Sequence, residues 1–196
     1  MLEANFPARR RIGIALLLFM LCAAAANAQL NSNAPTVTLA ATLNESLTVG
    51  LSGSTQTWST GTGNALTAGS ATNAGNASIT VTTSWVLKNA RSTVKLFAFF
   101  SSTNALIGVA DATQHITGSQ FQISVNGGGN TSVTQTNAGF GAASASLLLF
   151  NQAITGANKV ASRADTVTFN VDLSGTPQLP ADTYNGTLTI QAQAAP

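Results

Sequence analysis

The chain has 196 residues, of which 44% are hydrophobic and only 7% are charged, and its formal net charge is +2. Residues 29–196 carry five basic and five acidic side chains, so the net charge belongs to residues 1–28. A neutral surface does not attract the phosphate backbone of nucleic acids or anionic lipids, and we therefore expect no nucleic-acid partner.

Residues 1–28 have the pattern of a secretory signal peptide. Arginines at positions 9–11 precede the apolar run IGIALLLFMLCAAAA, and the small residues Ala26 and Ala28 stand just before the expected cleavage site. The run is shorter than the roughly 20 apolar residues that a membrane-spanning helix needs, so a retained N-terminal anchor is the less favoured alternative. We expect export to the periplasm, the cell surface or the extracellular medium.

The expected exported part, residues 29–196, contains no cysteine, because the only one, Cys22, lies inside the apolar run. Leu21 precedes this cysteine where a lipoprotein would have a small residue, so lipidation is not expected. Neither a disulfide nor a cysteine-ligated metal can stabilise the fold. The length suits one domain, and we expect residues 29–196 to form a single β-sandwich domain without a membrane span.

Apolar and polar residues alternate with period two through most of this domain, which is the pattern of half-buried strands. The pattern predicts an all-β fold, an antiparallel immunoglobulin-like β-sandwich with Greek-key connections and about 7–9 strands, with a small barrel as the alternative. The clearest expected strands are, in chain order, residues 37–43, 47–51, 79–87, 121–125 and 167–173. Their inward phase predicts a core that contains Leu39, Val49, Val81, Trp85, Leu96, Phe121, Phe169, Val171, Leu188 and Ile190.

Other segments do not follow simple alternation. Residues 92–102, STVKLFAFFSS, add Phe97 and Phe99 to the face opposite the other apolar residues. The favoured explanation is a strand covered on both faces, and the alternative is an exposed aromatic patch. The run LLLFNQAI at 147–154 does not distinguish a strand from a helical turn. VNGGGNTS at 125–132 predicts a hairpin turn.

The last stretch, LPADTYNGTLTIQAQAAP, combines a turn with an alternating strand. The residues that lead to Tyr184 are similar to the tyrosine corner of Greek-key sandwiches, in which the hydroxyl bonds to the upstream backbone. The alternative is an ordinary half-buried strand residue. We expect residues 183–193 to pair in a sheet with their apolar face inward, beside residues 37–43 or 167–173, in the same chain or in a neighbouring subunit.

Side chains for catalysis and metal binding are scarce. His115 is the only histidine and Asp111 precedes it by four residues, but a loop histidine near a loop aspartate is typical of a surface pair. No GxSxG motif occurs, and zinc would need several His or Cys ligands. Asp165 and Asp172 would lie on opposite faces of a strand, which does not suit calcium. We expect no enzymatic activity, no metal and no cofactor; a hydrolase around Asp111 and His115 is a third hypothesis.

The two ends of the expected domain resemble a known group of bacterial secreted proteins. The stretch LPADTYNGTLTI resembles the closing strand of pilin subunits of the archaic chaperone–usher type and of their spore coat protein U relatives, and PTVTLAATLNESLTV at 35–49 resembles their N-terminal segments. The resemblance implies an immunoglobulin-like fold and a place in a surface polymer. Such pilins generally carry a disulfide and a terminal aromatic residue, and residues 29–196 contain no cysteine and close on QAQAAP.

Two hypotheses of function follow. The favoured one is a secreted or cell-surface structural or adhesive protein, pilin-like and non-enzymatic, whose partners are copies of itself or other surface subunits joined by β-strand pairing. The alternative is a secreted carbohydrate-binding β-sandwich module. Trp58 is then the candidate ligand-binding residue, because it lies in the long polar connection at 53–78, whereas Trp85 follows the phase of the core.

Overall fold

Residues 36–59, 64–134 and 146–196 are described by the computed structural model of the chain. The chain divides into two compact units, residues 1–42 and residues 43–196. The expected signal peptide lies outside the described residues. All the strands described below belong to the second unit.

The fold is all-β, and the described residues contain no helix. Every strand pairing is antiparallel. The described strands are β1 (Ser46–Leu51), β2 (Ile79–Val86), β3 (Thr93–Phe99), β4 (Asn104–Gly108), β5 (His115–Thr117), β6 (Phe121–Val125), β7 (Thr131–Ser132), β8 (Ser146–Ala153), β9 (Val160–Val171), β10 (Tyr184–Asn185) and β11 (Thr189–Ala195).

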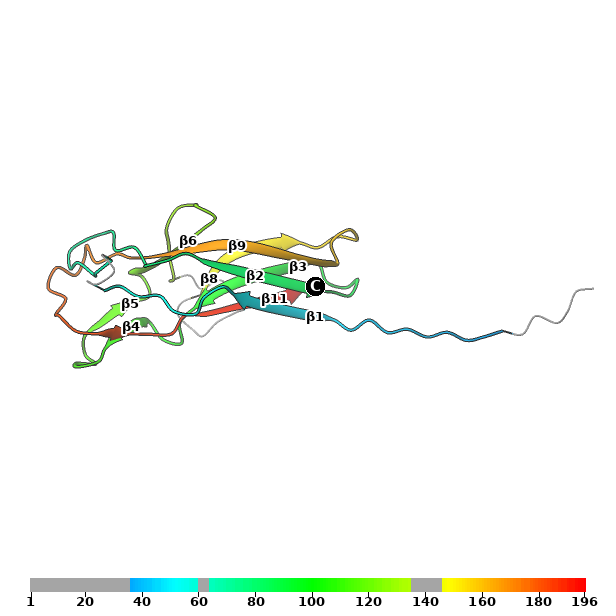
Figure 1. Cartoon of the computed structure of the whole chain (residues 1–196), viewed down its shortest axis with the longest axis horizontal. Helices are drawn as coiled ribbons and strands as arrows, with labels where there is room; N and C mark the ends of the chain where they lie inside the picture. The colour runs from blue at the N-terminus through cyan, green and yellow to red at the C-terminus, as the bar shows by residue number, and fades with distance from the viewer. Residues whose placement is uncertain (1–35, 60–63, 135–145) are drawn as a thin grey trace, which may run out of the picture. The chain divides into compact units, whose positions relative to one another are not determined.

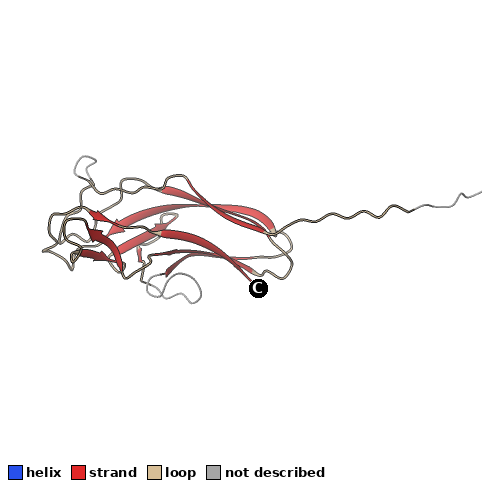
Figure 2. Ribbon diagram, turned by 90° about the horizontal axis from the view of Figure 1, so that it is seen from below, coloured by secondary structure: helices blue, strands red, loops and turns tan. Residues whose placement is uncertain are grey.

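The strands form three sheets. A five-stranded sheet has the order β1-β2-β9-β6-β7, a three-stranded sheet has the order β11-β3-β8, and a second three-stranded sheet has the order β10-β4-β5. Figure 2 shows the long strands in two layers, with short strands gathered at one end. The core cluster draws its side chains from both layers, so these two sheets enclose it as a sandwich.

The predicted core is largely confirmed. Val81, Trp85, Leu96, Phe121, Phe169 and Val171 are all buried. Val49, Leu188 and Ile190 are half-buried and pack against the same cluster. Leu39 is the exception, because 88% of it is exposed.

The prediction of a strand at residues 37–43 is wrong for the isolated chain. Residues 36–45 form no strand, and Val37 and Leu43 are 82% and 77% exposed. Alternating apolar and polar residues make a segment suitable for a sheet. The segment forms a strand only where a neighbouring strand supplies backbone hydrogen bonds. The segment 37–43 therefore has the sequence of a strand and no partner among the described residues of this chain.

Within the described part of this chain, the last strand pairs with neither expected neighbour, and pairing with a neighbouring subunit stays a prediction. β11 pairs with β3, with Ile190 opposite Ala98 and Ala192 opposite Leu96. The short β10 pairs with β4. The inward phase was predicted correctly, since Ile190 contacts the core cluster. Phase is a property of one strand, whereas the choice of neighbour depends on the whole fold.

Two ambiguous segments are resolved by β3 and β8. The run at 147–154 is mainly strand, and the pairing of β8 with β3 shifts register between Leu96 and Phe97. A β-bulge changes which side chains face inward, which explains why the leucine run shows no clean alternation. Phe97 is only 1% exposed and Phe99 is half-buried, so the interpretation of a covered strand is confirmed for Phe97.

The expected number of strands is too low, because the described residues form 11. Four short strands, β4, β5, β7 and β10, have 2 to 5 residues each, too few to show a period. The predicted hairpin is confirmed: β6 pairs with β7, and Asn126 and Gly127 between them have φ of 52° and 73°. Positive φ at two successive residues is typical of a tight hairpin turn.

Candidate functional site

The candidate site is the edge of the sandwich where β1 and β11 lie side by side (Figure 1). β1 is the outermost strand of the five-stranded sheet, and β11 is the outermost strand of the β11-β3-β8 sheet. Among the described residues, β1 pairs only with β2 and β11 only with β3. Each strand therefore has one edge that no described strand pairs with.

The core is incompletely covered along this edge. Inward side chains of the neighbouring strands are fully buried, as Val81 of β2 and Leu96 of β3 show with an exposure of 0%. The inward side chains of the two edge strands are only half-buried, although they pack against the core; they are Leu47, Val49, Ile190, Ala192 and Ala194. Covering this apolar row with another strand would remove it from water, which is favourable.

The backbone of β11 is oriented to accept another strand. The amide of Ser92, next to β3, donates to the carbonyl of Ala195 at 2.9 Å, so the polar groups of Ala195 face β3. Successive residues of a strand direct their backbone groups to opposite sides. The N–H and C=O groups of Ile190, Ala192 and Ala194 therefore point away from β3, toward the outer edge.

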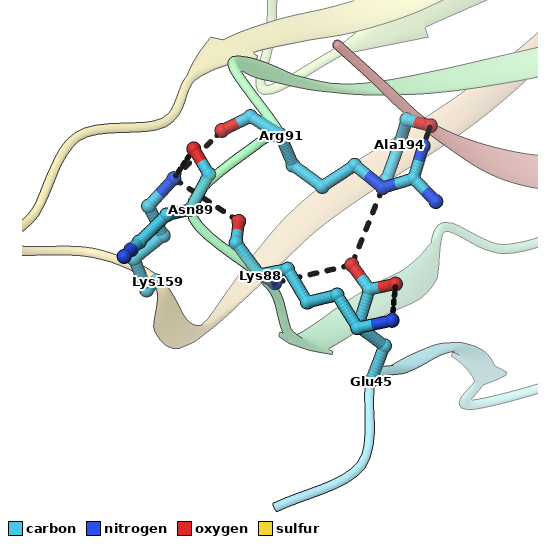
Figure 3. A network of polar contacts seen from close by, with 6 residues as sticks. All are labelled: Glu45, Lys88, Asn89, Arg91, Lys159 and Ala194. Atoms are coloured by element: carbon cyan, nitrogen blue, oxygen red, sulfur yellow. Dashed lines mark hydrogen bonds and ion pairs between the residues drawn. The ribbon is translucent and has the colours of Figure 1, made fainter.

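A polar cluster stands at one end of this edge (Figure 3). We call it the clasp and define it as Glu45, Lys88, Arg91 and the carbonyl of Ala194. Glu45 Oε1 accepts from the Lys88 amide at 3.1 Å and from Arg91 Nε at 3.2 Å, and Glu45 Oε2 lies 3.6 Å from Lys88 Nζ. Arg91 Nη1 donates to the Ala194 carbonyl at 3.5 Å. The clasp thus joins the residue before β1 to the end of β11.

Lys159 fixes the turn that carries the clasp. Its ammonium donates to the carbonyls of Lys88 at 3.2 Å, Asn89 at 3.1 Å and Arg91 at 2.7 Å (Figure 3). Three backbone carbonyls of one turn accept hydrogen bonds from this single ammonium group. One of them is the carbonyl of Arg91, so Lys159 helps to position the Arg91 backbone. The clasp is not predictable from the sequence pattern. Its only signal there is that Glu45, Lys88 and Arg91 are charged in a chain with very few charged residues.

A second charged group lies at the interior of the sandwich. Asp165 on β9 is 2% exposed, and Arg163 Nε lies 2.7 Å from its Oδ2. Asn126 Nδ2 also donates to Asp165 Oδ1 at 2.7 Å, and the guanidinium of Arg163 lies 4.6 Å from the centre of the Phe150 ring. The hydrogen bonds from Arg163 lower the pKa of Asp165, against the opposing effect of burial. The carboxylate is fully partnered, which is typical of a structural ion pair.

The described acidic side chains all have a pKa below their ordinary values. Hydrogen bonds lower it in each case; the residues are Glu45, Asp111, Asp165, Asp172 and Asp182. For Glu45 the largest cause is the hydrogen bond from the Lys88 backbone amide, followed by the hydrogen bond from the Arg91 side chain. A carboxylate whose pKa is depressed by folding stabilises the folded state above its unfolded pKa.

We therefore expect the domain to lose stability in acid. These carboxylates contribute fully to the stability of the folded state above their ordinary pKa values of 3.8 for Asp and 4.5 for Glu. The contribution is lost as the pH falls through their lower pKa values in the folded state. Thermal melting followed by circular dichroism at pH 7, 5 and 3 should give similar midpoints at the first two values and a lower midpoint at pH 3. A midpoint that rises at pH 3 would contradict the assigned direction.

The prediction of a tyrosine corner is confirmed. The hydroxyl of Tyr184 donates to the carbonyl of Pro180 at 2.8 Å, four residues upstream. The carboxylate of Asp182 accepts from the amides of Ala110 at 3.1 Å and Asp111 at 3.2 Å, which joins this corner to the loop after β4. These contacts hold the segment that leads into β10, which ends four residues before β11 begins.

Trp58 is half-buried and packs against the core cluster. Its indole N–H donates to the carbonyl of Asn73 at 2.9 Å, and its ring meets the ring of Phe121 edge to face at 5.9 Å. Asn73 is itself buried and bonds through its backbone amide to Asn170 at 2.8 Å. Trp58 therefore joins its own part of the connection to Asn73 and to the sandwich core, and its role as a glycan-binding residue stays a prediction.

In the described residues, His115 and Asp111 each contact Thr113, and a hydrolase at this pair stays an untested hypothesis. Asp111 Oδ1 accepts from the amide and hydroxyl of Thr113 at 2.9 and 2.7 Å, and His115 Nδ1 lies 3.0 Å from the Thr113 carbonyl. Each side chain bonds to the same turn rather than to the other. His115 was expected in a loop, but it is the first residue of strand β5.

Over the described ranges, no three His, Cys, Asp or Glu side chains gather closely enough to hold a metal ion. Nor do those ranges include a helix of the length and hydropathy that a membrane crossing requires. Compared with known proteins, the chain matches no model of a protein family and no curated protein.

Proposed function

We propose that the chain is an exported structural protein of the cell surface, without enzymatic activity, that associates with copies of itself by β-strand pairing. The observation that carries the proposal is the combination of an incompletely covered sandwich edge with an unpaired segment of strand-like sequence. The half-buried row on β1 and β11 offers apolar surface and backbone groups. Residues 37–43 could supply the missing neighbour strand, whose apolar face would cover this row.

The occupant of the edge is the segment 37–43 of another copy. Val37, Leu39 and Leu43 are 82%, 88% and 77% exposed, and with Ala41 they share one face of an extended chain. The segment has the same length as β11, which has 7 residues. It contains no charged residue and no proline, the residues that commonly prevent pairing at strand edges. A structural role for such pairing agrees with the resemblance to pilin subunits.

The test is a change of one inward residue of the segment. Burying a leucine is worth about 1.5–3 kcal/mol, so Leu39→Asp is expected to raise the dissociation constant for self-association by roughly 10- to 150-fold or more. Sedimentation of residues 29–196 over a range of concentrations measures this constant. Thr38→Asp adds the same charge on the opposite face of the segment and is the control.

Each result has a definite meaning. Association that is weakened by Leu39→Asp and much less by Thr38→Asp supports pairing through the apolar face. A chain that stays monomeric at every concentration, or one that both variants weaken equally, contradicts the proposal. If the structural function is correct, the protein must self-associate and must show no enzymatic activity toward added glycans.

A further inference from the structure

Arg91 occupies a backbone group that a strand added to β11 would need. The carbonyl of Ala194 points to the outer edge of β11, as its position beside Ala195 requires. A strand that pairs along the whole of β11 must donate an amide to this carbonyl. Arg91 Nη1 already donates to it at 3.5 Å.

The same side chain also connects the two edge strands. Arg91 Nε donates to Glu45, which immediately precedes β1, while Nη1 reaches β11 (Figure 3). Glu45 is only 24% exposed at its side chain and is held in turn by the Lys88 amide. Lys159 fixes the backbone of the turn at three carbonyls. The guanidinium therefore lies across one end of the edge in a defined position.

We propose that Arg91 is an autoinhibitory latch, which competes with an incoming strand for the end of β11 and must leave Ala194 before pairing is complete. The inference rests on the proposed strand addition at this edge. The contact is long for a hydrogen bond and the Arg91 side chain is 37% exposed, so the latch is weak enough to be displaced. It slows pairing and does not prevent it.

Removal of the latch should make strand addition faster. Arg91→Met keeps most of the aliphatic stem and removes both the charge and the hydrogen-bond donors. The loss of one competing hydrogen bond predicts an association rate constant and an affinity that rise about 3- to 10-fold. Glu45→Gln keeps the Arg91 side chain but weakens the contact that holds it to residue 45. We expect a smaller rise in the association rate constant and in the affinity.

The experiment uses residues 29–196 with Leu39→Asp, so that the chain's own segment does not compete. A fluorescein-labelled peptide of residues 36–44 is the probe, and its binding is followed by stopped-flow fluorescence anisotropy. Lys95→Met is the matched control, because it removes the same charge from the adjacent β3 and takes part in no contact of the clasp. Melting midpoints are measured for all variants, and Glu45→Gln provides the test if Arg91→Met does not fold.

The outcomes separate the two proposals. Faster peptide binding to Arg91→Met and Glu45→Gln, with Lys95→Met unchanged, supports the latch. Equal binding of the peptide to all variants overturns the latch and leaves strand addition standing. Slower binding to Arg91→Met also overturns it, since Arg91 would then help to hold the incoming strand. If no variant binds the peptide, strand addition itself fails, and the latch fails with it.

Discussion

Phe169→Ala is expected to lower the free energy of unfolding by about 3–5 kcal/mol. Phe169 is 6% exposed and lies on the inner face of β9, which pairs with β2 on one side and β6 on the other. Its ring meets Phe121 at 5.9 Å. Truncation would remove this contact and leave a cavity in the centre of the sandwich. A loss of this size is a large part of a typical domain stability of about 5–15 kcal/mol.

Urea unfolding followed by tryptophan fluorescence measures this loss. Val160→Ala is the matched control, because Val160 lies on the same strand and is 63% exposed. It should change the free energy by less than about 0.5 kcal/mol. A loss below about 1 kcal/mol for Phe169→Ala would show that the ring does not contribute to a packed core.

Gly186→Ala is expected to lower the free energy of unfolding by about 1–3 kcal/mol or more. A Cβ at this position would overlap the backbone carbonyl oxygen of Ala105, with Leu106 Cδ2 also closer than van der Waals contact. A backbone atom within a fold cannot move aside as a flexible side chain can. The pairing of β10 with β4, which neighbours this glycine, would therefore be forced apart.

Gly175→Ala is the control for this prediction, because a Cβ there would meet no atom within 4 Å. The same methyl group is added in both variants, so intrinsic effects of alanine on the unfolded chain are matched. Melting midpoints should fall for Gly186→Ala and stay near the parent value for Gly175→Ala. Equal midpoints for the two variants would show that the backbone contact at Gly186 is not constrained.

The local features of the fold were predictable from the sequence. Alternation identified β1, β2, β6 and β11 and gave their inward phase, because side chains on a strand change sides at every residue. The hairpin after Val125 followed from Asn126 and Gly127, which tolerate positive φ. The tyrosine corner at Tyr184 followed from the turn before it. Each of these depends on residues close together in the chain.

Other features depend on contacts between distant residues, and no local pattern carries them. The pairing of β11 with β3 is decided by which strands the whole fold brings together, and the same alternation would have suited several neighbours. The bulge in β8 appears only once β8 is aligned with β3. The need for glycine at position 186 appears only when the Ala105 carbonyl is in place.

The candidate site shows the same division. The sequence by itself determined that residues 37–43 can form a strand, since their apolar residues lie on one face. Only the tertiary structure decided that this strand has no described partner in its own chain and that the inward row on β1 and β11 is half-covered. It also brought Arg91 to Ala194, 103 positions apart in the sequence. A sequence specifies which side of a strand is apolar, but the packing of the whole chain decides which apolar surfaces remain exposed.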